Sequence, residues 1–409
     1  MTIHGVTDND LYPARFGASQ RLFGLLRGLA RDHEVRALCV VPNRNRAPRE
    51  QTAHGVRLLR RKAWYTSVTW RLERARLAPL MLAAHGHRAC ARGLLSHFGA
   101  NPDVLMADLT VAGVLERGAA RLRVYHAHNV ESDHFRAAGP RLWLGRAWAS
   151  HVLDLERRAA AAADLVVAAS DEDGARFQEL FGLDGRRVAV IPNGFDETEV
   201  RPPSPAERAA ARTALGQTER DTVALFVGSN VPHNRAALRM LVERVMPSLA
   251  GAGVRLLVVG GVSRALAGRR ETWLEARPEV ADLLPMLHAA DIGLNPVVSG
   301  GGSNVKLPTY LAAGLAVVST PFGLRGFADL SPWVISAEPA SFGAALAARP
   351  QGWHARGEAM PAPLAGYAWG GLGQRLGRCF AAKLSAGREH GTGDLGTPRR
   401  MAGAGGSRS

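Results

Sequence analysis

Short apolar runs recur along the chain, and longer amphipathic stretches separate them. The runs lie at 33–42, 102–108, 121–129, 164–170, 187–194, 222–230, 253–261, 291–297 and 314–320. Runs that are apolar throughout and do not alternate are typical of strands buried on both faces of a parallel sheet. Their alternation with helical stretches predicts βαβ units and therefore an α/β protein.

The stretches between the runs have helical character. Ser19 is placed to cap a helix that carries Leu22, Leu26 and Leu29 on one side. Residues 144–163 are rich in alanine and amphipathic, and residues 206–215 follow a Pro-rich segment. These stretches supply the helices that the βαβ units need.

The Pro-rich segment RPPSP, at 201–205, is the best candidate for a domain boundary, because few contacts usually cross such linkers. We expect one domain over 1–200 and a second over 201–365. Residues 366–385 predict a last helix, although five glycines weaken that prediction. Residues 386–409 are mostly Gly, Arg, Ser and Thr, which predicts a disordered tail.

Composition excludes several classes of protein. The chain has 409 residues, of which 46% are hydrophobic and 21% charged, so a wholly disordered chain is excluded. No uncharged apolar run approaches the ~18 residues of a spanning helix. The N-terminal residues lack the basic and apolar regions of a signal peptide, and the three cysteines, Cys39, Cys90 and Cys379, are scattered. These features favour a cytoplasmic protein.

The net charge of +15 has more than one explanation. Only three of the 51 basic residues are lysines (Lys62, Lys306 and Lys383), so the charge reflects an arginine-rich composition in part. Residues 44–78 hold ten Lys or Arg against two Glu, interleaved with Trp64, Tyr65 and Trp70. An anionic membrane surface is therefore a candidate partner, and the chain-wide arginine bias is the alternative. Nucleic acid is not expected, because no basic helix carries a base-reading motif.

Polar residues crowd the end of the predicted strand at 121–129. His126, His128, Asn129 and Glu131 lie where ligands bind in open α/β sheets, beyond the carboxyl ends of strands. A substrate-contacting His128 and a surface-loop His128 are both open at this point. A metal is not expected, because no Cys or carboxylate set completes the His126–His128 pair, or the His85–His87 pair.

Asp171 and Asp173 have the D-x-D spacing of some metal-dependent sugar transferases. They also follow Ser170 at the start of a predicted helix, where Ser-x-x-Asp forms a capping box. We favour the capping interpretation.

Several glycines precede predicted helices and suit phosphate binding. Gly17 precedes the first helix, Gly228 and Ser229 follow the strand at 222–230, and Gly260 ends the next strand. Glycine allows a ligand to approach the backbone, and helix N-termini attract anions. None of these segments is G-x-G-x-x-G, so the dinucleotide fingerprint is absent.

The segment from Ser299 to Gly326 is the most informative. A flexible loop of Gly300, Gly301 and Gly302 leads to Ser303 and Asn304, which open a helix with Lys306 in its first turn. A cation there opposes the helix dipole unless an anion is bound. Backbone N–H groups together with Lys306 predict a diphosphate site; a solvated helix end is the alternative.

These segments together resemble a known family. GASQRLFGLLRGLARDHEV, VYHAHNVES, DLVVAASDEDGARF with VAVIPNGFD, FVGSNVPHNRAALRMLVERVMPSL, and ADIGLNPVVSGGGSNVKLPTYLAAGLAVVSTPFGLRG occur in the family's order. The chain resembles a GT-B glycosyltransferase of the retaining family-4 type, within the glycosyl transferases group 1 superfamily, over about residues 11–385.

The resemblance implies two Rossmann-like domains with parallel sheets facing a cleft. The N-terminal domain, 1–200, would bind a hydroxyl acceptor, and 201–365 would bind a nucleotide-diphosphate sugar. The helix at 366–385 would cross back to the first domain. Such enzymes generally need no metal and no other cofactor. The reaction implied is sugar transfer with retention of configuration.

The resemblance also assigns roles. Lys306 matches the family's phosphate-binding lysine, His128 the inner-face histidine, and Gly17 the N-terminal loop glycine. We expect His128 and Lys306 to be catalytic. The remaining predicted donor-binding residues are Gly228, Ser229, Arg235, Gly260, Gly301, Gly302, Ser303, Asn304 and Thr309, and the predicted acceptor-binding residues are His126, Asn129 and Glu131.

The chain departs from the family pattern at two positions. The family often carries two glutamates eight residues apart, and this chain has Gly301 and Thr309 there. The second glutamate usually grips the nucleotide ribose, whereas Thr309 offers a weaker hydrogen bond. A catalytically inactive GT-B protein that binds a sugar or nucleotide is therefore the alternative function. A nucleotide-sugar epimerase lacks a paired acid–base set here.

Overall fold

The apolar runs of the sequence form two sheets in the computed structural model, which describes residues 1–14, 16–137, 143–278, 280–301 and 303–391. The first sheet contains β1 (Thr2–Thr7), β2 (Glu34–Pro42), β3 (Glu50–Ala53), β4 (Val56–Ala63), β5 (Val104–Ala107), β6 (Leu122–His126), β7 (Leu165–Ala168) and β8 (Val188–Val190). Its strand order is β3-β4-β2-β1-β5-β6-β7-β8, and every neighbouring pair is parallel except β3 with β4.

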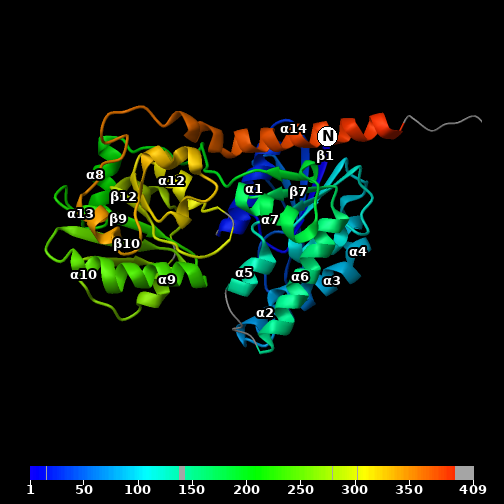
Figure 1. The fold of residues 1–409 in the computed structure, drawn as a ribbon, viewed down its shortest axis with the longest axis horizontal. Helices are drawn as coiled ribbons and strands as arrows, with labels where there is room; N and C mark the ends of the chain where they lie inside the picture. The colour runs from blue at the N-terminus through cyan, green and yellow to red at the C-terminus, as the bar shows by residue number, and fades with distance from the viewer. Residues whose placement is uncertain (15, 138–142, 279, 302, 392–409) are drawn as a thin grey trace, which may run out of the picture.

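The second sheet is parallel throughout the part of the chain described. It contains β9 (Thr222–Val227), β10 (Val254–Val259), β11 (Leu274–Arg277), β12 (Ile292–Asn295), β13 (Ala316–Ser319) and β14 (Val334–Ser336), in the order β11-β10-β9-β12-β13-β14. The predicted α/β class with two parallel-sheet, Rossmann-like domains is therefore confirmed, and Figure 1 shows the two lobes side by side.

Helices cover both faces of each sheet because the strands are apolar on both sides. One face of the first sheet packs with α1 (Gly17–Leu29) and α14 (Trp369–Gly391), and the other with helices that include α3 (Ala83–Ala89), α4 (Ala91–Leu95) and α6 (Gly145–Ala162). The other α-helices are α2 (Trp64–Arg74), α5 (Glu131–Ala137), α7 (Asp171–Phe181), α8 (Pro205–Ala214), α9 (Pro232–Met240), α10 (Met246–Ser248), α11 (Leu284–Ala289), α12 (Lys306–Ala312) and α13 (Phe342–Ala347).

The start of α1 differs from the prediction. The helix begins at Gly17 with Phe16 as its N-cap, and Ser19 lies inside the first turn. The Ser19 hydroxyl donates to the Phe16 carbonyl at 2.9 Å, and it accepts the Phe16 N–H at 3.3 Å. The prediction that Ser19 is the cap is therefore wrong by three residues, because its side chain bonds back to the true cap.

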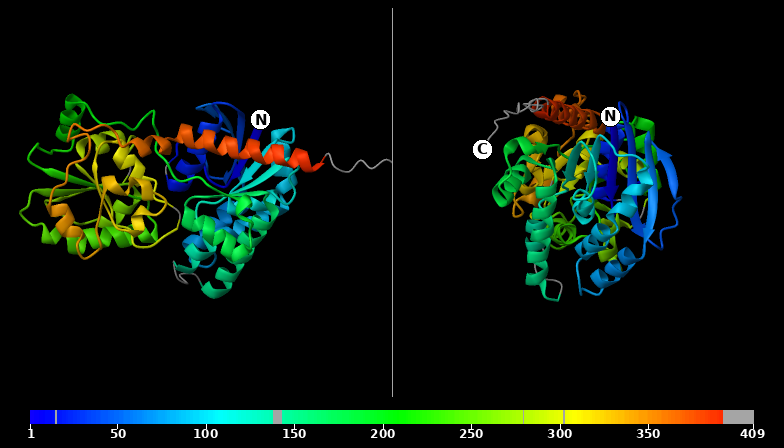
Figure 2. Two further views of the ribbon diagram at one scale, coloured as in Figure 1. Left: turned by 45° about the horizontal axis from the view of Figure 1, so that its top comes forward. Right: turned by 90° about the vertical axis from the view of Figure 1, so that its right-hand side faces the viewer.

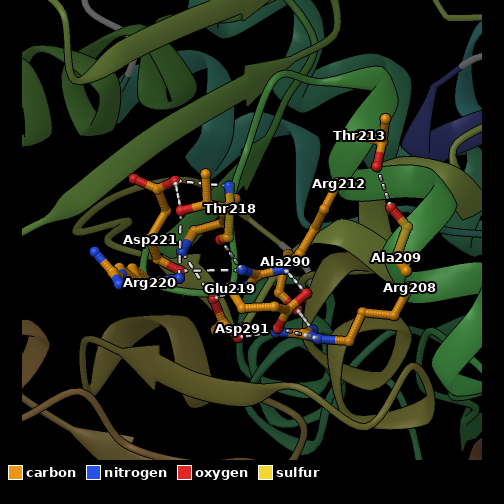
Figure 3. Close-up of polar contacts among 11 residues, drawn as sticks. Arg208, Ala209, Arg212, Thr213, Thr218, Glu219, Arg220, Asp221, Ala290 and Asp291 are labelled. Atoms are coloured by element: carbon orange, nitrogen blue, oxygen red, sulfur yellow. Dashed lines mark hydrogen bonds and ion pairs between the residues drawn. The ribbon is translucent and has the colours of Figure 1, made fainter.

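A polar network fixes the beginning of the second domain (Figure 3). Arg208 and Arg212 lie one turn apart on α8, and both donate to the Asp291 carboxylate, at 2.5 and 2.6 Å. Arg212 also donates to the Thr218 carbonyl at 2.6 Å. Because Asp291 immediately precedes β12 and also accepts the Val223 N–H of β9, the network joins α8 to two strands.

The last helix, α14, lies along α1 of the first domain (Figures 1 and 2). Its glycines allow a close crossing, because a Cβ on Gly373 would lie 2.4 Å from the Cα of Gly28. The helix extends to Gly391, beyond the predicted tail boundary at 386. Residues 392–409 lie outside the described residues.

The two chain segments that pass between the domains lie beside each other and pair like strands. The Phe195 N–H donates to the Tyr367 carbonyl at 3.0 Å, and the Trp369 N–H donates to the Phe195 carbonyl at 3.1 Å. Both passages of the chain between the domains are thus held in one place.

Candidate active site between the two domains

Asp108 is the centre of a polar cluster at the carboxyl ends of β1, β5 and β6. It follows β5 and is 3% exposed. One carboxylate oxygen accepts the Thr7 hydroxyl at 2.5 Å, and the other accepts His126 Nδ1 at 2.8 Å. His128 Nε2 lies 3.4 Å from the same oxygen. Asp108 therefore orients both imidazoles.

The ionisation states in this cluster follow from burial and charge. Burial raises the pKa of Asp108, but the charge of His128 and the hydrogen bond from His126 outweigh it and hold that pKa far below its usual range. Burial lowers the pKa of His126 to about 4. At neutral pH, His126 is thus a neutral ring that donates from Nδ1 to an ionised carboxylate.

Asp108, His126 and His128 also form a candidate set of metal ligands. The expectation that no carboxylate accompanies the histidine pair was wrong, because Asp108 reaches it from a different strand. The ligand atoms lie within 4.8 Å of one another. Within this cluster, Asp108 and His126 form a hydrogen bond at 2.8 Å. His85 and His87 point elsewhere: His85 stacks on His151, and His87 bonds the Tyr65 hydroxyl.

Glu131 begins α5, three residues after His128. Its N–H and that of Ser132 donate to the carboxylate of Glu156, at 2.8 and 2.9 Å, which satisfies the first turn of the helix. Burial, with the charge of Glu156, raises the pKa of Glu131 to about 7. Glu131 can therefore give up or accept a proton near neutral pH.

Lys306 begins α12 on the opposite side of the site. Its ammonium donates to Asn234 Oδ1 at 3.1 Å and lies 4.8 Å from the centre of the Phe226 ring. Burial lowers the pKa of Lys306 to about 7. No carboxylate forms an ion pair with Lys306 in the described part of the chain, so its charge lacks an anionic partner there.

Glycine loops surround Lys306. Gly260 has φ +95°, and a Cβ there would lie 2.6 Å from the Gly228 carbonyl oxygen, so these two loops touch through their backbones. Asn234 donates to the Ser229 carbonyl at 3.1 Å and accepts from Lys306, which links the Gly228–Ser229 turn to the ammonium. Arg235, from α9, donates to Asn230 at 2.9 Å.

The two domains meet at these strand ends. A Cβ on Gly17, at the start of α1, would lie 3.9 Å from Val305, next to Lys306. A Cβ on Gly301 would lie only 2.6 Å from the Cβ of Asn129. The structure thus brings the predicted donor and acceptor residues to one place. It also explains Gly301, because a larger side chain there meets the other domain.

Other predicted donor residues form contacts within the protein. The Ser303 hydroxyl donates to the Ala169 carbonyl at 3.0 Å, and Asn193 donates to the Ser303 carbonyl at 2.6 Å. The Thr309 hydroxyl donates to the Val305 carbonyl at 2.9 Å, and the Asn304 carbonyl accepts the N–H of Leu307. Their donor-binding roles stay predictions, and Gly302 lies outside the described residues.

The structure adds interface residues that the sequence analysis missed. Ser170 caps α7, as favoured, and the carboxylate of Asp173 accepts Arg325 of the other domain at 2.9 Å. Arg21 is 1% exposed and donates to Ala168 and Asn193. Burial lowers the pKa of Arg21 to about 10. Functional arginines are hard to predict in a chain this rich in arginine. Asp108 could have been predicted as a site residue, because it is a carboxylate directly after a predicted strand.

Two protein-family models match the chain. The model described as Glycosyltransferase Family 4 matches residues 17–199, and that of Glycosyl transferases group 1 matches residues 221–348. Together they cover most of the chain and meet at the boundary between its two sheets.

Curated relatives match over shorter segments. A D-inositol 3-phosphate glycosyltransferase of Nocardia farcinica is 35% identical over 131 residues, which cover 31% of this chain and 27% of the relative. One of Geodermatophilus obscurus is 31% identical over 42% of this chain and 41% of its own. The chain thus spans about a quarter to two fifths of these relatives.

Solved structures are similar over nearly the whole chain. Sucrose-phosphate synthase from Thermosynechococcus elongatus has a TM-score of 0.62 at 17% identity, covering 95% of this chain and 98% of that one. Anabaena HepE, solved with UDP and glucose, has a TM-score of 0.59 at 16% identity, covering 95% and 99%. At such identities the likeness shows the shared two-domain fold.

Proposed function

Because this chain belongs to the GT-B glycosyltransferases of the family-4 and group 1 type, we propose that it transfers a sugar from a nucleotide-diphosphate donor to a hydroxyl acceptor. The observation that carries this proposal is Lys306. Its ammonium lacks a carboxylate partner in the described structure and lies beside the Gly228–Ser229 turn. A diphosphate supplies the missing charge.

The proposed mechanism divides the work between the domains. Lys306 and the N–H groups at the start of α1, where Gly17 faces Val305, stabilise the negative charge that develops on the departing diphosphate. On the other side, the buried pair of Asp108 and His126 supports His128, whose partly exposed ring contacts the transferred sugar or the acceptor. Attack on the face that the diphosphate leaves gives retention of configuration.

Glu131 is the acceptor-side group best suited to move a proton. Its pKa of about 7 allows it to take the proton of the acceptor hydroxyl and to release it to solvent. The acceptor class that fits is a polyol, glycan or glycolipid hydroxyl. The named relatives act on D-inositol 3-phosphate, which makes an inositol derivative a first acceptor to test.

The second candidate function is ligand binding without turnover. Gly301 and Thr309 replace the family's glutamates, and the Thr309 hydroxyl already bonds to Val305. A protein of this kind binds a nucleotide sugar and neither hydrolyses nor transfers it.

An activity assay separates the two functions. Radiolabelled UDP-, GDP-, ADP- and dTDP-sugars are incubated with the protein, with and without polyol acceptors, and released nucleotide is measured. We expect turnover of one donor, and about a 100-fold loss or more in Lys306→Ala. Lys383→Ala, on α14, is the matched control and should keep wild-type activity. Binding of a donor without turnover would favour the second function.

We also propose a cytoplasmic location. The three cysteines are free in the structure, which suits a reducing compartment.

A further inference from the structure

Helix α2 presents three large apolar residues to solvent, although its Tyr65 packs against the core. Thr66 and Thr69 face the protein and are 7% and 6% exposed, and their hydroxyls donate to carbonyls of the same helix and of Ala63. Trp64, in contrast, is 68% exposed, and Val68 and Trp70 are exposed as well. A surface helix normally buries its large apolar residues, so the three exposed ones on α2 depart from this pattern.

Neighbouring segments extend this surface. Leu77 and Leu80, directly after α2, are exposed, as are Trp143 and Leu144 at the start of α6. The Trp143 N–H donates to the Arg76 carbonyl at 3.0 Å, which holds the two segments together. We call α2, residues 77–80 and residues 143–144 the tryptophan patch. All three exposed tryptophans of the described chain lie in it, and monomeric proteins rarely expose such a cluster without a binding function.

Cations surround the patch. Arg71, Arg74, Arg76 and Arg146 are exposed, and none of them forms an ion pair among the residues described. The Arg74 guanidinium lies 4.8 Å from the centre of the Trp70 ring. The one acidic residue of α2, Glu73, is half-buried, and it accepts a backbone hydrogen bond from Leu80. The rim of the patch is therefore positively charged.

A basic hollow adjoins the patch where β4 ends and α2 begins. It has a volume of about 450 Å³, and four of its lining side chains, Arg49, Arg60, Arg61 and Lys62, are cations against one carboxylate, Glu50. Asp10 already neutralises Arg60 at 2.7 Å, whereas Lys62 is exposed. This hollow suits an anionic headgroup of phosphate chemistry.

We propose that the tryptophan patch docks the protein onto an anionic lipid surface. Tryptophan and arginine side chains together suit the boundary between lipid headgroups and acyl chains, where the indoles insert and the cations meet phosphates. A second copy of this chain fits less well, because a two-fold contact would bring the same arginines face to face. Among the described helices, none has the length and apolar character of a membrane span.

The position of the patch relates it to the candidate active site. The strand β4 ends at Ala63, immediately before α2, and β6 ends at His126; both strands run in the same direction in one sheet. The patch and the histidines therefore lie toward the same edge of the sheet, where Figure 1 shows α2 and α5. The docking proposal does not depend on the proposed transferase activity.

Vesicle co-sedimentation tests the proposal. Vesicles of phosphatidylcholine alone are compared with vesicles that also contain phosphatidylglycerol, at low and high salt. We expect binding to the anionic vesicles only, weakening with salt. Trp64→Ser with Trp143→Ser should reduce the bound fraction about tenfold, and Arg74→Glu with Arg76→Glu should abolish it.

Matched controls keep the outcome interpretable. Ile335→Ser and Met360→Ser remove exposed apolar residues away from the patch, and both should bind vesicles like the wild type. Circular dichroism checks that every variant is folded. Failure of the wild type to bind anionic vesicles at low salt would overturn the proposal. So would a dimer, seen by sedimentation equilibrium, that Trp64→Ser dissociates without any change in vesicle binding.

Discussion

Burial disfavours the protonated form of Lys306 and lowers its pKa to about 7. A bound diphosphate favours the protonated form and therefore raises this pKa. Between pH 7 and the raised value, binding takes up a proton, so affinity falls as the pH rises, by up to about tenfold per pH unit. Calorimetric titration of a nucleotide sugar in buffers of different ionisation enthalpy measures this uptake.

The same titration has an internal control. Lys306→Arg keeps the positive charge at all relevant pH values, because an arginine does not lose its proton there. It should bind the donor without the pH dependence above 7. A wild-type affinity that stays constant from pH 7 to pH 9 would contradict this role.

Asp108 acts on the reaction through the histidines. Asp108→Asn keeps the shape and removes the charge that orients His126 and His128, so kcat should fall about 10- to 100-fold, as when other orienting partners of a functional histidine are lost. Donor affinity should change less than about twofold, because Lys306 lies on the other domain. The control is Asp103→Asn, because Asp103 bonds to Thr2 at the opposite end of the sheet. Equal losses in kcat and in donor affinity would indicate a purely structural Asp108.

At the level of single residues, the sequence revealed some functional groups and hid others. Lys306 could be predicted because lysine is rare in this chain and a cation at a helix start opposes the dipole. Arg21 could not, because arginine is common in this chain and only the fold places Arg21 against Ala168 and Asn193. Asp108 could be predicted as a polar residue that follows an apolar strand, but only the fold places it beside His126.

Among the elements, the contact of α1 with α14 depends on glycine. A Cβ on Gly28 would lie 2.4 Å from the Trp369 carbonyl oxygen and 2.8 Å from the Cα of Gly373. Gly28→Ala should therefore lower the free energy of unfolding by about 1–3 kcal/mol, because the two helices must separate. Urea denaturation measures the change.

Gly371→Ala is the matched control on α14. No atom lies within 4 Å of the Cβ it would add, so the gain in helix propensity should stabilise the protein, by less than about 1 kcal/mol. A loss of stability in this variant equal to that in Gly28→Ala would show that helix crossing is not the cause.

The elements also show where sequence patterns succeed. Each of the nine apolar runs contains a strand of one of the two sheets, because burial on both faces demands continuous apolar residues. The strand β4 was missed because charges interrupt its pattern; Arg60 is nevertheless 3% exposed, paired with Asp10. In α14, Gly373 is one of the glycines that weakened the prediction, and it packs on Gly28 of α1, which local propensity cannot reveal.

At the scale of the whole molecule, Gly301 and Asn129 test whether the domains close as the structure shows. Gly301→Ala places a Cβ 2.6 Å from that of Asn129, so it should hold the domains apart and weaken donor binding. Combining it with Asn129→Gly removes the clash, and affinity should recover. Small-angle scattering of the variants reports the separation; additive effects of the two substitutions would contradict the proposed contact.

The domain interface is the part that the sequence could not predict. The pairs Arg325–Asp173 and Ser303–Asn193 join residues more than a hundred positions apart, and the motifs that contain these residues do not show which of them pair. The resemblance to GT-B proteins predicted two facing domains, while the individual contacts follow from side chains that only the folded chain brings together.

A thermal-shift panel of UDP, GDP, ADP, dTDP and their sugar conjugates tests the central claim, that Lys306 holds a nucleotide diphosphate between the domains. A ligand at ~100 times its Kd stabilises the native state by about 2.7 kcal/mol. We predict a clear shift with one nucleotide, lost in Lys306→Ala and kept in Lys383→Ala. An absence of any shift in the wild type, or an equal shift in Lys306→Ala, would contradict the account.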